Sequence, residues 1–191
     1  MSRLPIATVG DPVLRERAPE VDLDELRSEP VQRLIDDLIE TKRAAGGAGL
    51  AATQVSARRR IAVVEVDAQT RYRYKPLIPL TVMVNPVIEP LSEETLMINE
   101  GCLSIPDLRG DVERCVAVRA RYLDRAGVPH ETVAHGLSAG TFQHELDHLD
   151  GVLFLDRVTD PRTFTTWEQF ERHHQADFLR RIGPYTRDAG A

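Results

Sequence analysis

Two segments that lie far apart in the sequence contain the types of side chain that bind metal ions and move protons. One is QHELDH (residues 143–148), which contains an HExxH pattern, and the other is EGCLS (residues 100–104). On a helix, His144 and His148 lie one turn apart on the same face, so both imidazoles can bind one metal ion with Glu145 beside it. This layout is typical of a metal-dependent hydrolase.

The two histidines need a third protein ligand, because a catalytic metal usually takes three ligands and keeps one position for water. We favour Cys102. The pattern HExxHxxGxxH is excluded because Phe154 stands where its third histidine would be. A class of metallopeptidase that takes a glutamate from the next helix remains an alternative through Glu168, although we interpret that side chain as part of an exposed helical face. A metal-stabilised binding domain without catalysis is a third reading.

Apolar residues surround the two histidines in the sequence, which predicts that the helix carrying them is buried. Burying two imidazoles and two acids without a shared partner would cost several kcal/mol, and a metal ion removes that cost. A bound divalent metal also lowers the pKa of its water from about 15.7 towards 7, and Glu145 is placed to accept the proton and deliver it to a leaving amine.

Three blocks of the sequence resemble one family. Residues 47–54 (GAGLAATQ), 100–104 (EGCLS) and 143–151 (QHELDHLDG) are similar, in the same order, to the GxGLAAxQ, EGCxS and QHExDHLxG motifs of peptide deformylase. The resemblance extends from residues 10–15 to residues 151–154. It weakens in the loop around residues 67–80 and in the C-terminal helix.

This resemblance implies a reaction, which is hydrolysis of the formyl group from N-formylmethionyl peptides with release of formate. It implies that Cys102, His144 and His148 bind the metal and that Glu145 is the general base and acid. The oxyanion would be held by the side chain of Gln54 and by the backbone N–H of Leu103.

The resemblance also implies substrate contacts and a cofactor. Gly49 and Leu103 would pair with the extended peptide backbone, and Arg109 would lie near the exit side of the peptide. Glu100, paired with Arg114, is either an acid that supports a metal ligand or one half of a surface ion pair. The family usually works with Fe(II), and a thiolate with two imidazoles can also hold Zn(II), Ni(II) or Co(II).

One departure from the family bears on specificity. Gly140 stands where the family more often places a larger aliphatic residue in the wall of the methionine pocket. We therefore predict a weaker preference for methionine than is typical, because the glycine would widen that wall.

Composition indicates one globular domain spanning residues 1–191, since 42% of the residues are hydrophobic and 28% are charged. No leader segment or membrane span is recognisable, so we expect a cytoplasmic protein without a membrane partner. The net charge of −6 argues against binding to DNA. Arg58, Arg59 and Arg60 are interpreted as a solvated turn or strand end rather than an RNA-binding patch. The resemblance implies nascent chains and a transient ribosome contact as partners, although the mixed charge of the C-terminal helix gives ribosome docking little support. Cys115 is interpreted as a buried strand residue.

Hydrophobic periodicity predicts an α+β fold in which antiparallel β-sheets pack around a central helix carrying HExxH, with a C-terminal helix. Helices are expected from residue 28 to the glycines at 46–47 and from residue 164 to 182. Strands are expected at residues 60–66, 81–84, 87–88, 112–122 and 128–134.

Overall fold

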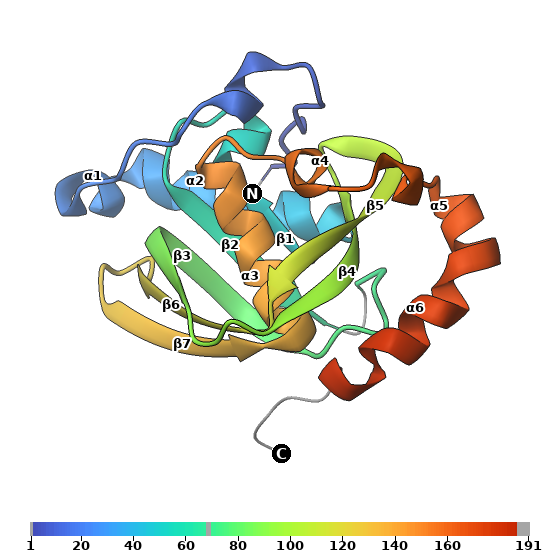
Figure 1. Ribbon diagram of the computed structural model, residues 1–191. Helices are drawn as coiled ribbons and strands as arrows, with labels where there is room; N and C mark the ends of the chain where they lie inside the picture. Colours follow the sequence, from blue (N-terminus) through green and yellow to red (C-terminus); the bar gives the residue numbers. More distant parts are fainter. Residues whose placement is uncertain (1, 68–69, 187–191) are drawn as a thin grey trace.

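The computed structural model describes residues 2–67 and 70–186 and combines two antiparallel β-sheets with helices (Figure 1). The larger sheet has the strand order β1-β2-β3-β6-β7, and β4 and β5 form a separate hairpin. The strands are β1 (Gly49–Ala51), β2 (Ile61–Val66), β3 (Ile78–Pro90), β4 (Thr95–Cys102), β5 (Ile105–Cys115), β6 (Ala117–Leu123) and β7 (Pro129–His135). The expected mixture of helices and antiparallel sheets with a C-terminal helix is confirmed.

Helices lie on both faces of the larger sheet and at the ends of the chain. They are η1 (Pro12–Arg15), α1 (Leu23–Arg27), α2 (Glu29–Ala44), η2 (Ala52–Val55), α3 (Gly136–Leu149), α4 (Phe154–Arg157), η3 (Pro161–Thr163), α5 (Trp167–Gln169), η4 (Phe170–His174), α6 (Gln175–Ile182) and η5 (Gly183–Tyr185). None of the helices in the described part of the chain has the length and apolar character needed to cross a membrane.

Strand β2 is buried on both of its faces, which explains its continuous apolar sequence. Ile61 and Val63 join the cluster that contains the apolar residues of α2, whereas Ala62 and Val64 join the cluster that contains Phe142 of α3. Because successive side chains of a strand point to opposite faces, β2 separates two helices and fixes both to the sheet. Figure 1 shows α3 running between the larger sheet and the β4–β5 hairpin.

The end of α3 depends on a glycine. Gly151 has φ +73, and a Cβ atom there would lie 2.6 Å from the carbonyl oxygen of Arg15. A glycine tolerates both this left-handed conformation and the close approach of the N-terminal segment. The chain can therefore turn sharply after His148 without displacing the segment that packs beside it.

Two expectations about local structure were wrong, and one strand was missed. The strand predicted over residues 112–122 is two strands in different sheets, which separate at Val116. Strand β4 was not predicted, although it carries the EGC residues. Arg60 is not solvated: its side chain is buried and donates to Asp150 Oδ1 at 2.7 Å and to the carbonyl oxygen of Pro86. Burial of this guanidinium is possible because those acceptors satisfy it.

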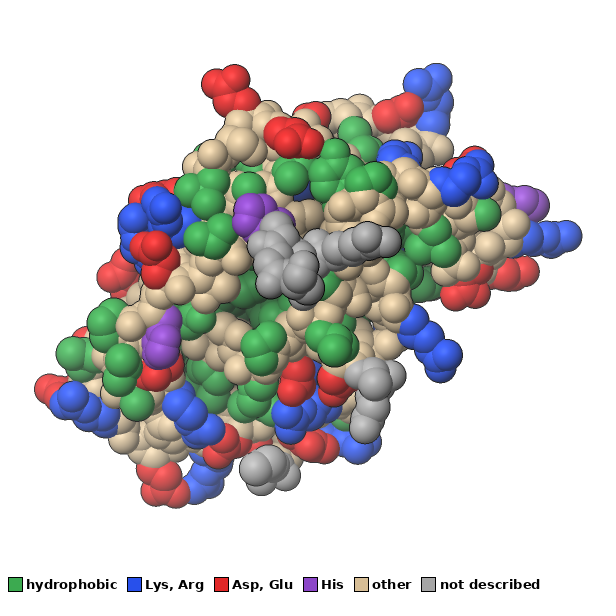
Figure 2. All heavy atoms as spheres, turned by 90° about the horizontal axis from the view of Figure 1, so that it is seen from below, with side chains coloured by type: hydrophobic (Ala, Val, Ile, Leu, Met, Phe, Trp, Pro, Cys, Tyr) green, Lys and Arg blue, Asp and Glu red, His purple; other side chains and the backbone are tan. Residues whose placement is uncertain are grey.

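Charged side chains on the surface form ion pairs with near neighbours. On β6 and β7, Arg119 and Arg121 each form ion pairs with Glu131, and Arg121 also pairs with Glu89. Figure 2 shows acidic and basic side chains lying next to each other around the edge of the face seen from below, with hydrophobic side chains between them.

Candidate metal centre and active-site pocket

Cys102 is placed by the tight turn of the β4–β5 hairpin. It pairs with Ile105 in the strand register, so Leu103 and Ser104 form the connection between the strands. The backbone N–H of Ser104 lies 3.4 Å from Cys102 Sγ. This turn directs the sulfur towards α3, and it fixes the thiol of the EGCLS segment beside the HExxH segment of α3.

Cys102, His144 and His148 meet at one point. One ligand atom of each residue lies within 4.8 Å of the others, and Cys102 Sγ is 3.2 Å from His148 Nε2. Burial would by itself lower the pKa of His144, but Cys102 and Glu100 outweigh it and raise that pKa well above its ordinary value. The thiol and the Glu100 carboxylate thus favour a positive charge at this point, and a bound metal ion would supply that charge in place of the proton on His144.

Glu100 orients the first histidine. Glu100 Oε2 lies 2.9 Å from His144 Nδ1, which leaves Nε2 as the ring nitrogen for a metal. Arg114 donates to both oxygens of Glu100, at 2.7 and 2.9 Å, and to Asp147 Oδ2 at 2.6 Å. Burial raises the pKa of Glu100, but Arg114 and His144 outweigh it and hold that pKa well below its usual range. The pair is buried, so the surface ion-pair reading is wrong.

Glu145 is buried beside this group. Its Oε2 has no hydrogen-bond partner among the described residues, and burial raises its pKa from 4.5 to about 7. A Cβ atom on Gly49 would overlap the Glu145 carboxylate, so the glycine of β1 makes room for it. An unsatisfied buried carboxylate next to a candidate metal site is suited to accept a proton from water there.

The side chain of Gln54 is fixed by hydrogen bonds at both ends. Its Oε1 accepts from the backbone N–H of Ala51 at 2.9 Å, which directs Nε2 towards Ser104 Oγ at 3.1 Å and Cys102 Sγ at 3.5 Å. An amide donor therefore faces the sulfur without freedom to rotate. Such a fixed donor is suited to hold a developing negative charge.

The donor set fits a divalent metal. His148 Nδ1 is buried without a partner in the described part of the chain, while its Nε2 faces the sulfur. Burial, with the nearby charge of His144, lowers the pKa of His148 well below 6.5, so this imidazole is neutral as a metal ligand must be. Two imidazoles and a thiolate satisfy the ligand preferences of Zn(II), Fe(II), Ni(II) and Co(II).

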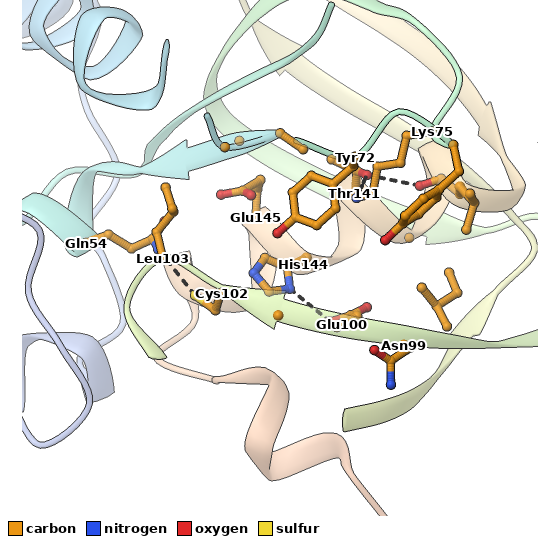
Figure 3. Close-up of a pocket in the computed structure, with 18 residues that line it drawn as sticks. Gln54, Tyr72, Lys75, Asn99, Glu100, Cys102, Leu103, Thr141, His144 and Glu145 are labelled. Carbon is orange, nitrogen blue, oxygen red and sulfur yellow. Dashed lines mark hydrogen bonds and ion pairs between the residues drawn. The ribbon is translucent and has the colours of Figure 1, made fainter. Parts of the chain in front are cut away.

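One pocket joins this group to the segment around residues 72–75 (Figure 3). Its walls come from β1, β4, α3 and that segment: Gly47, Ala48, Gly49, Gln54, Tyr72, Tyr74, Lys75, Ile98, Asn99, Glu100, Gly101, Cys102, Leu103, Leu137, Gly140, Thr141, His144 and Glu145. Lys75 Nζ donates to Thr141 Oγ1 at 2.8 Å, and burial lowers its pKa to about 8, opposed by Glu100 and Glu145.

Sequence reasoning missed the contribution of residues 72–75. The two tyrosines and the lysine lie where the resemblance to the family weakens, and they follow no helical or strand period. Their signal is composition alone, since aromatic and basic residues alternate in Tyr72-Arg73-Tyr74-Lys75, which lies in a segment expected to be a loop.

The sequence expectation for Arg109 is not supported. Its side chain is fully buried, its Nε donates to Asn99 Oδ1 at 2.7 Å, and its guanidinium lies 3.9 Å from the ring centroid of Trp167 and 4.4 Å from that of Phe170. Arg109 is also not among the pocket-lining residues. The structure gives this guanidinium a packing role between β4 and the C-terminal helices.

Two further expectations are settled by packing. The Gly140 position is not open, because a Cβ atom there would lie 2.5 Å from Ile98 Cδ1, so the isoleucine of β4 fills the space. Glu168 is exposed on α5 and is not part of the one candidate metal group found among the described residues. Cys102 is the third member of that group.

A thiol and two imidazoles around one point, with an unpaired buried carboxylate beside them, form the donor set of a metal-dependent hydrolase. Comparison with known proteins agrees with this class. The family model described as polypeptide deformylase matches residues 3–164. The chain is 39% identical over 160 residues to peptide deformylase of Leptospira biflexa, and the aligned residues cover 83% of this chain and 89% of that protein.

Other comparisons give the same result. The chain is 42% identical to peptide deformylase 1A, chloroplastic/mitochondrial, of Arabidopsis thaliana, over 87% of this chain, and it spans 65% of the length of that protein. A crystal structure of a class I type b peptide deformylase from Acinetobacter baumannii bound to Met-Ala-Ser superimposes with a TM-score of 0.78 at 40% identity, covering 82% of this chain and 99% of that one. The chain therefore belongs to the polypeptide deformylase family.

Proposed function

We propose that this protein removes the N-formyl group from N-formylmethionyl peptides and nascent chains and releases formate. The observation that carries the proposal is the convergence of Cys102, His144 and His148 beside a pocket whose lining includes Glu145 and the fixed amide of Gln54. Family membership supports this substrate class, and the tripeptide Met-Ala-Ser bound to the Acinetobacter baumannii relative corresponds to the peptide product of such a reaction.

Cys102, His144 and His148 would hold the metal, and the bound ion would supply an activated water and polarise the formyl carbonyl. Glu145 accepts the proton of the attacking water on its unpaired Oε2 and delivers it to the leaving amine. Gln54 Nε2 and the backbone N–H of Leu103 donate to the oxyanion of the tetrahedral state, an effect of roughly 3 kcal/mol for each donor.

The peptide backbone has a place beside the reacting carbonyl. Gly49 lies on the edge strand β1 of the larger sheet, opposite the turn that contains Leu103, and both residues line the pocket. An extended peptide can add to an exposed strand edge through main-chain hydrogen bonds. The backbone groups of Gly49 and Leu103 would then fix the substrate in register with Glu145.

The native metal is proposed to be Fe(II), with Zn(II) or Ni(II) present in protein purified in air. Oxygen destroys an Fe(II)–thiolate site readily, so aerobic preparation should lower the activity or replace the iron. Metal analysis and activity of matched aerobic and anaerobic preparations test this assignment. Equal activity with no metal in either preparation contradicts the metalloenzyme mechanism.

The central test is formate release from formyl-Met-Ala-Ser by protein loaded with Fe(II) under anaerobic conditions. Cys102→Ala should abolish stoichiometric metal binding and formate release. Glu145→Gln should retain the metal but lose at least about a hundredfold in kcat, the range of a general acid–base contribution.

Glu168→Ala serves as the matched control, because its carboxylate is exposed and should affect neither metal content nor rate. Loss of metal in Glu168→Ala with retention in Cys102→Ala would instead support a metallopeptidase with a glutamate ligand. Full function in Glu145→Gln would indicate a metal-stabilised binding domain.

A further inference from the structure

Lys75 places an ammonium in the pocket that the proposed reaction does not use. Its Nζ donates to Thr141 Oγ1 at 2.8 Å and lies 5.0 Å from the centroid of the Tyr72 ring. Thr141 donates its own hydroxyl proton to the carbonyl oxygen of Leu137, so it meets the lysine as an acceptor. An ammonium has three N–H donors. Thr141 takes one of them, and within residues 2–67 and 70–186 it is the one hydrogen-bond acceptor of Lys75 Nζ.

The C-terminal helices hold the segment that carries Lys75. The Tyr72 ring lies 5.7 Å from the ring of Trp167 in α5, and the Tyr74 ring lies 5.4 Å from that of Phe178 in α6. The lysine is therefore anchored at its base by aromatic packing and at its tip by Thr141. These contacts fix the position of the Lys75 side chain in the pocket.

Lys75 lies at the opposite end of the pocket from the oxyanion donors. Figure 3 shows Gln54, Leu103 and Cys102 at one end, Tyr72, Lys75 and Thr141 at the other, and His144 and Glu145 between them. Ile98 and Leu137 also line the pocket, and both lie near Thr141: the Thr141 hydroxyl donates to the carbonyl oxygen of Leu137, and Ile98 Cδ1 packs over the neighbouring Gly140. A first residue whose formyl group is near Cys102 can direct its side chain along this apolar wall towards the ammonium.

We propose that Lys75 determines specificity by adapting the pocket to formylated peptides whose first side chain carries a hydrogen-bond-accepting oxygen near its end. Methionine sulfoxide is one member of this class that keeps the length of methionine. The inference rests on the proposed deformylase function and names a substrate class for the same site. It also replaces Gly140 with Lys75 as the reason for a weaker preference for methionine.

The first side chain of the peptide decides whether the N–H donors of the Lys75 ammonium keep hydrogen-bond acceptors. A thioether sulfur is a weak acceptor, so a methionine side chain that covers the ammonium removes water from its N–H groups without replacing the hydrogen bonds. A sulfoxide oxygen accepts those bonds, and a hydrogen bond to a charged donor is stronger than one between neutral groups. The site should therefore discriminate between two first residues of similar length by the presence of an oxygen.

The test compares kcat/KM for formate release from formyl-Met(O)-Ala-Ser and formyl-norleucyl-Ala-Ser. Norleucine matches methionine in length and has no acceptor. In the wild-type protein the sulfoxide peptide should react at least as well as the norleucine peptide, and Lys75→Met should lower the ratio of the two by about tenfold. The ratio within one protein cancels differences in folding and metal content.

Arg73→Met is the matched control, because it removes an exposed positive charge two residues away in the same segment and should leave the ratio unchanged. An unchanged ratio in Lys75→Met overturns the inference. If that variant does not fold, the wild-type protein decides alone, and a higher kcat/KM of the wild-type protein for the norleucine peptide than for the sulfoxide peptide overturns it. Absence of formate from every peptide, formyl-Met-Ala-Ser included, refutes the proposed function instead.

Discussion

Glu100 Oε2 lies 2.9 Å from His144 Nδ1, and this contact fixes the imidazole that faces Cys102. Arg114 in turn donates to both oxygens of Glu100. Residues that orient a metal-binding histidine in this way typically change metal affinity by about 10- to 100-fold when they are removed. Glu100→Ala should therefore weaken zinc binding by that factor, as measured by competition with a chromogenic chelator.

Glu113→Ala is the control for this experiment. Glu113 lies one residue before Arg114 on β5 but is exposed and accepts a hydrogen bond from Thr95. Its removal should leave zinc affinity unchanged. Equal affinities for the wild-type protein and Glu100→Ala would show that the contact does not position the ligand.

Gly49→Ala should impair catalysis more than folding. The added methyl group would overlap the Glu145 carboxylate, which must move away from the position beside Cys102 and the histidines. Because small displacements of a catalytic group cost about a hundredfold in rate, we expect a fall in kcat of that order with metal content retained.

Gly183→Ala controls for the loss of a glycine, because a Cβ atom at that position meets no atom within 4 Å. Both variants would be compared by formate release and by metal analysis of the same preparations. A normal kcat in Gly49→Ala would show that catalysis does not depend on the observed position of the Glu145 carboxylate.

Trp167→Ala should weaken both the fold and the pocket. The guanidinium of the buried Arg109 lies 3.9 Å from the centroid of the Trp167 ring, and the centroid of the Tyr72 ring lies 5.7 Å from that of Trp167. Loss of the aromatic surface and of the cation–π contact should lower the free energy of unfolding by about 2 kcal/mol. Because Tyr72 also lines the pocket, loss of this support should raise KM several-fold. Urea denaturation and steady-state kinetics measure the two effects.

The neighbouring Glu168→Ala is the control for stability, since its exposed side chain should change the unfolding free energy by less than about 0.5 kcal/mol. Equal urea midpoints for Trp167→Ala and the wild-type protein would show that the aromatic contact with Arg109 adds nothing to stability.

Glu65 should give the stability of the protein a pH dependence. The hydrogen bond from Arg43, opposed by burial and reinforced by Lys42, lowers the pKa of Glu65 from 4.5 to about 2. A lowered carboxyl pKa stabilises the folded state above the unfolded pKa, and this contribution is lost as the pH falls from about 4.5 towards 2. Glu65→Gln should thus cost roughly 2 kcal/mol at pH 7, because it leaves the buried Lys42 without its counter-charge.

The difference between the wild-type protein and Glu65→Gln should shrink below pH 4.5, since a protonated glutamate resembles glutamine. Urea unfolding at a series of pH values measures it. Glu29→Gln removes an exposed i,i+4 pair and should cost no more than about 0.5 kcal/mol at any pH. A difference for Glu65→Gln that is constant with pH contradicts the assignment.

Much of the candidate site could be predicted from the sequence. The spacing of His144 and His148 places both imidazoles on one face of a helix, and Glu145 lies beside that face because it directly follows His144 in the sequence. The class of fold followed from apolar runs and turn residues, because these patterns are local. Strand limits were less predictable, since the break at Val116 depends on β5 and β6 joining different sheets.

Only the tertiary structure decided which distant residues meet. Cys102 reaches the two imidazoles because the hairpin turn at Leu103 and Ser104 places its sulfur over α3. Glu168 is not part of the candidate metal group, because α5 packs against Arg109 through Trp167 and leaves the Glu168 side chain exposed. Neither outcome is encoded in local spacing.

The sequence by itself determined the chemistry that is available, because residue types and short-range periods fix which ligands and proton carriers share a face. The tertiary structure alone decided what fills the space around that chemistry. Ile98 occupies the room left by Gly140, and Lys75 enters the pocket from a segment without periodicity. The physical reason is close packing, in which the surroundings of one residue are set by neighbours that come from elsewhere in the chain.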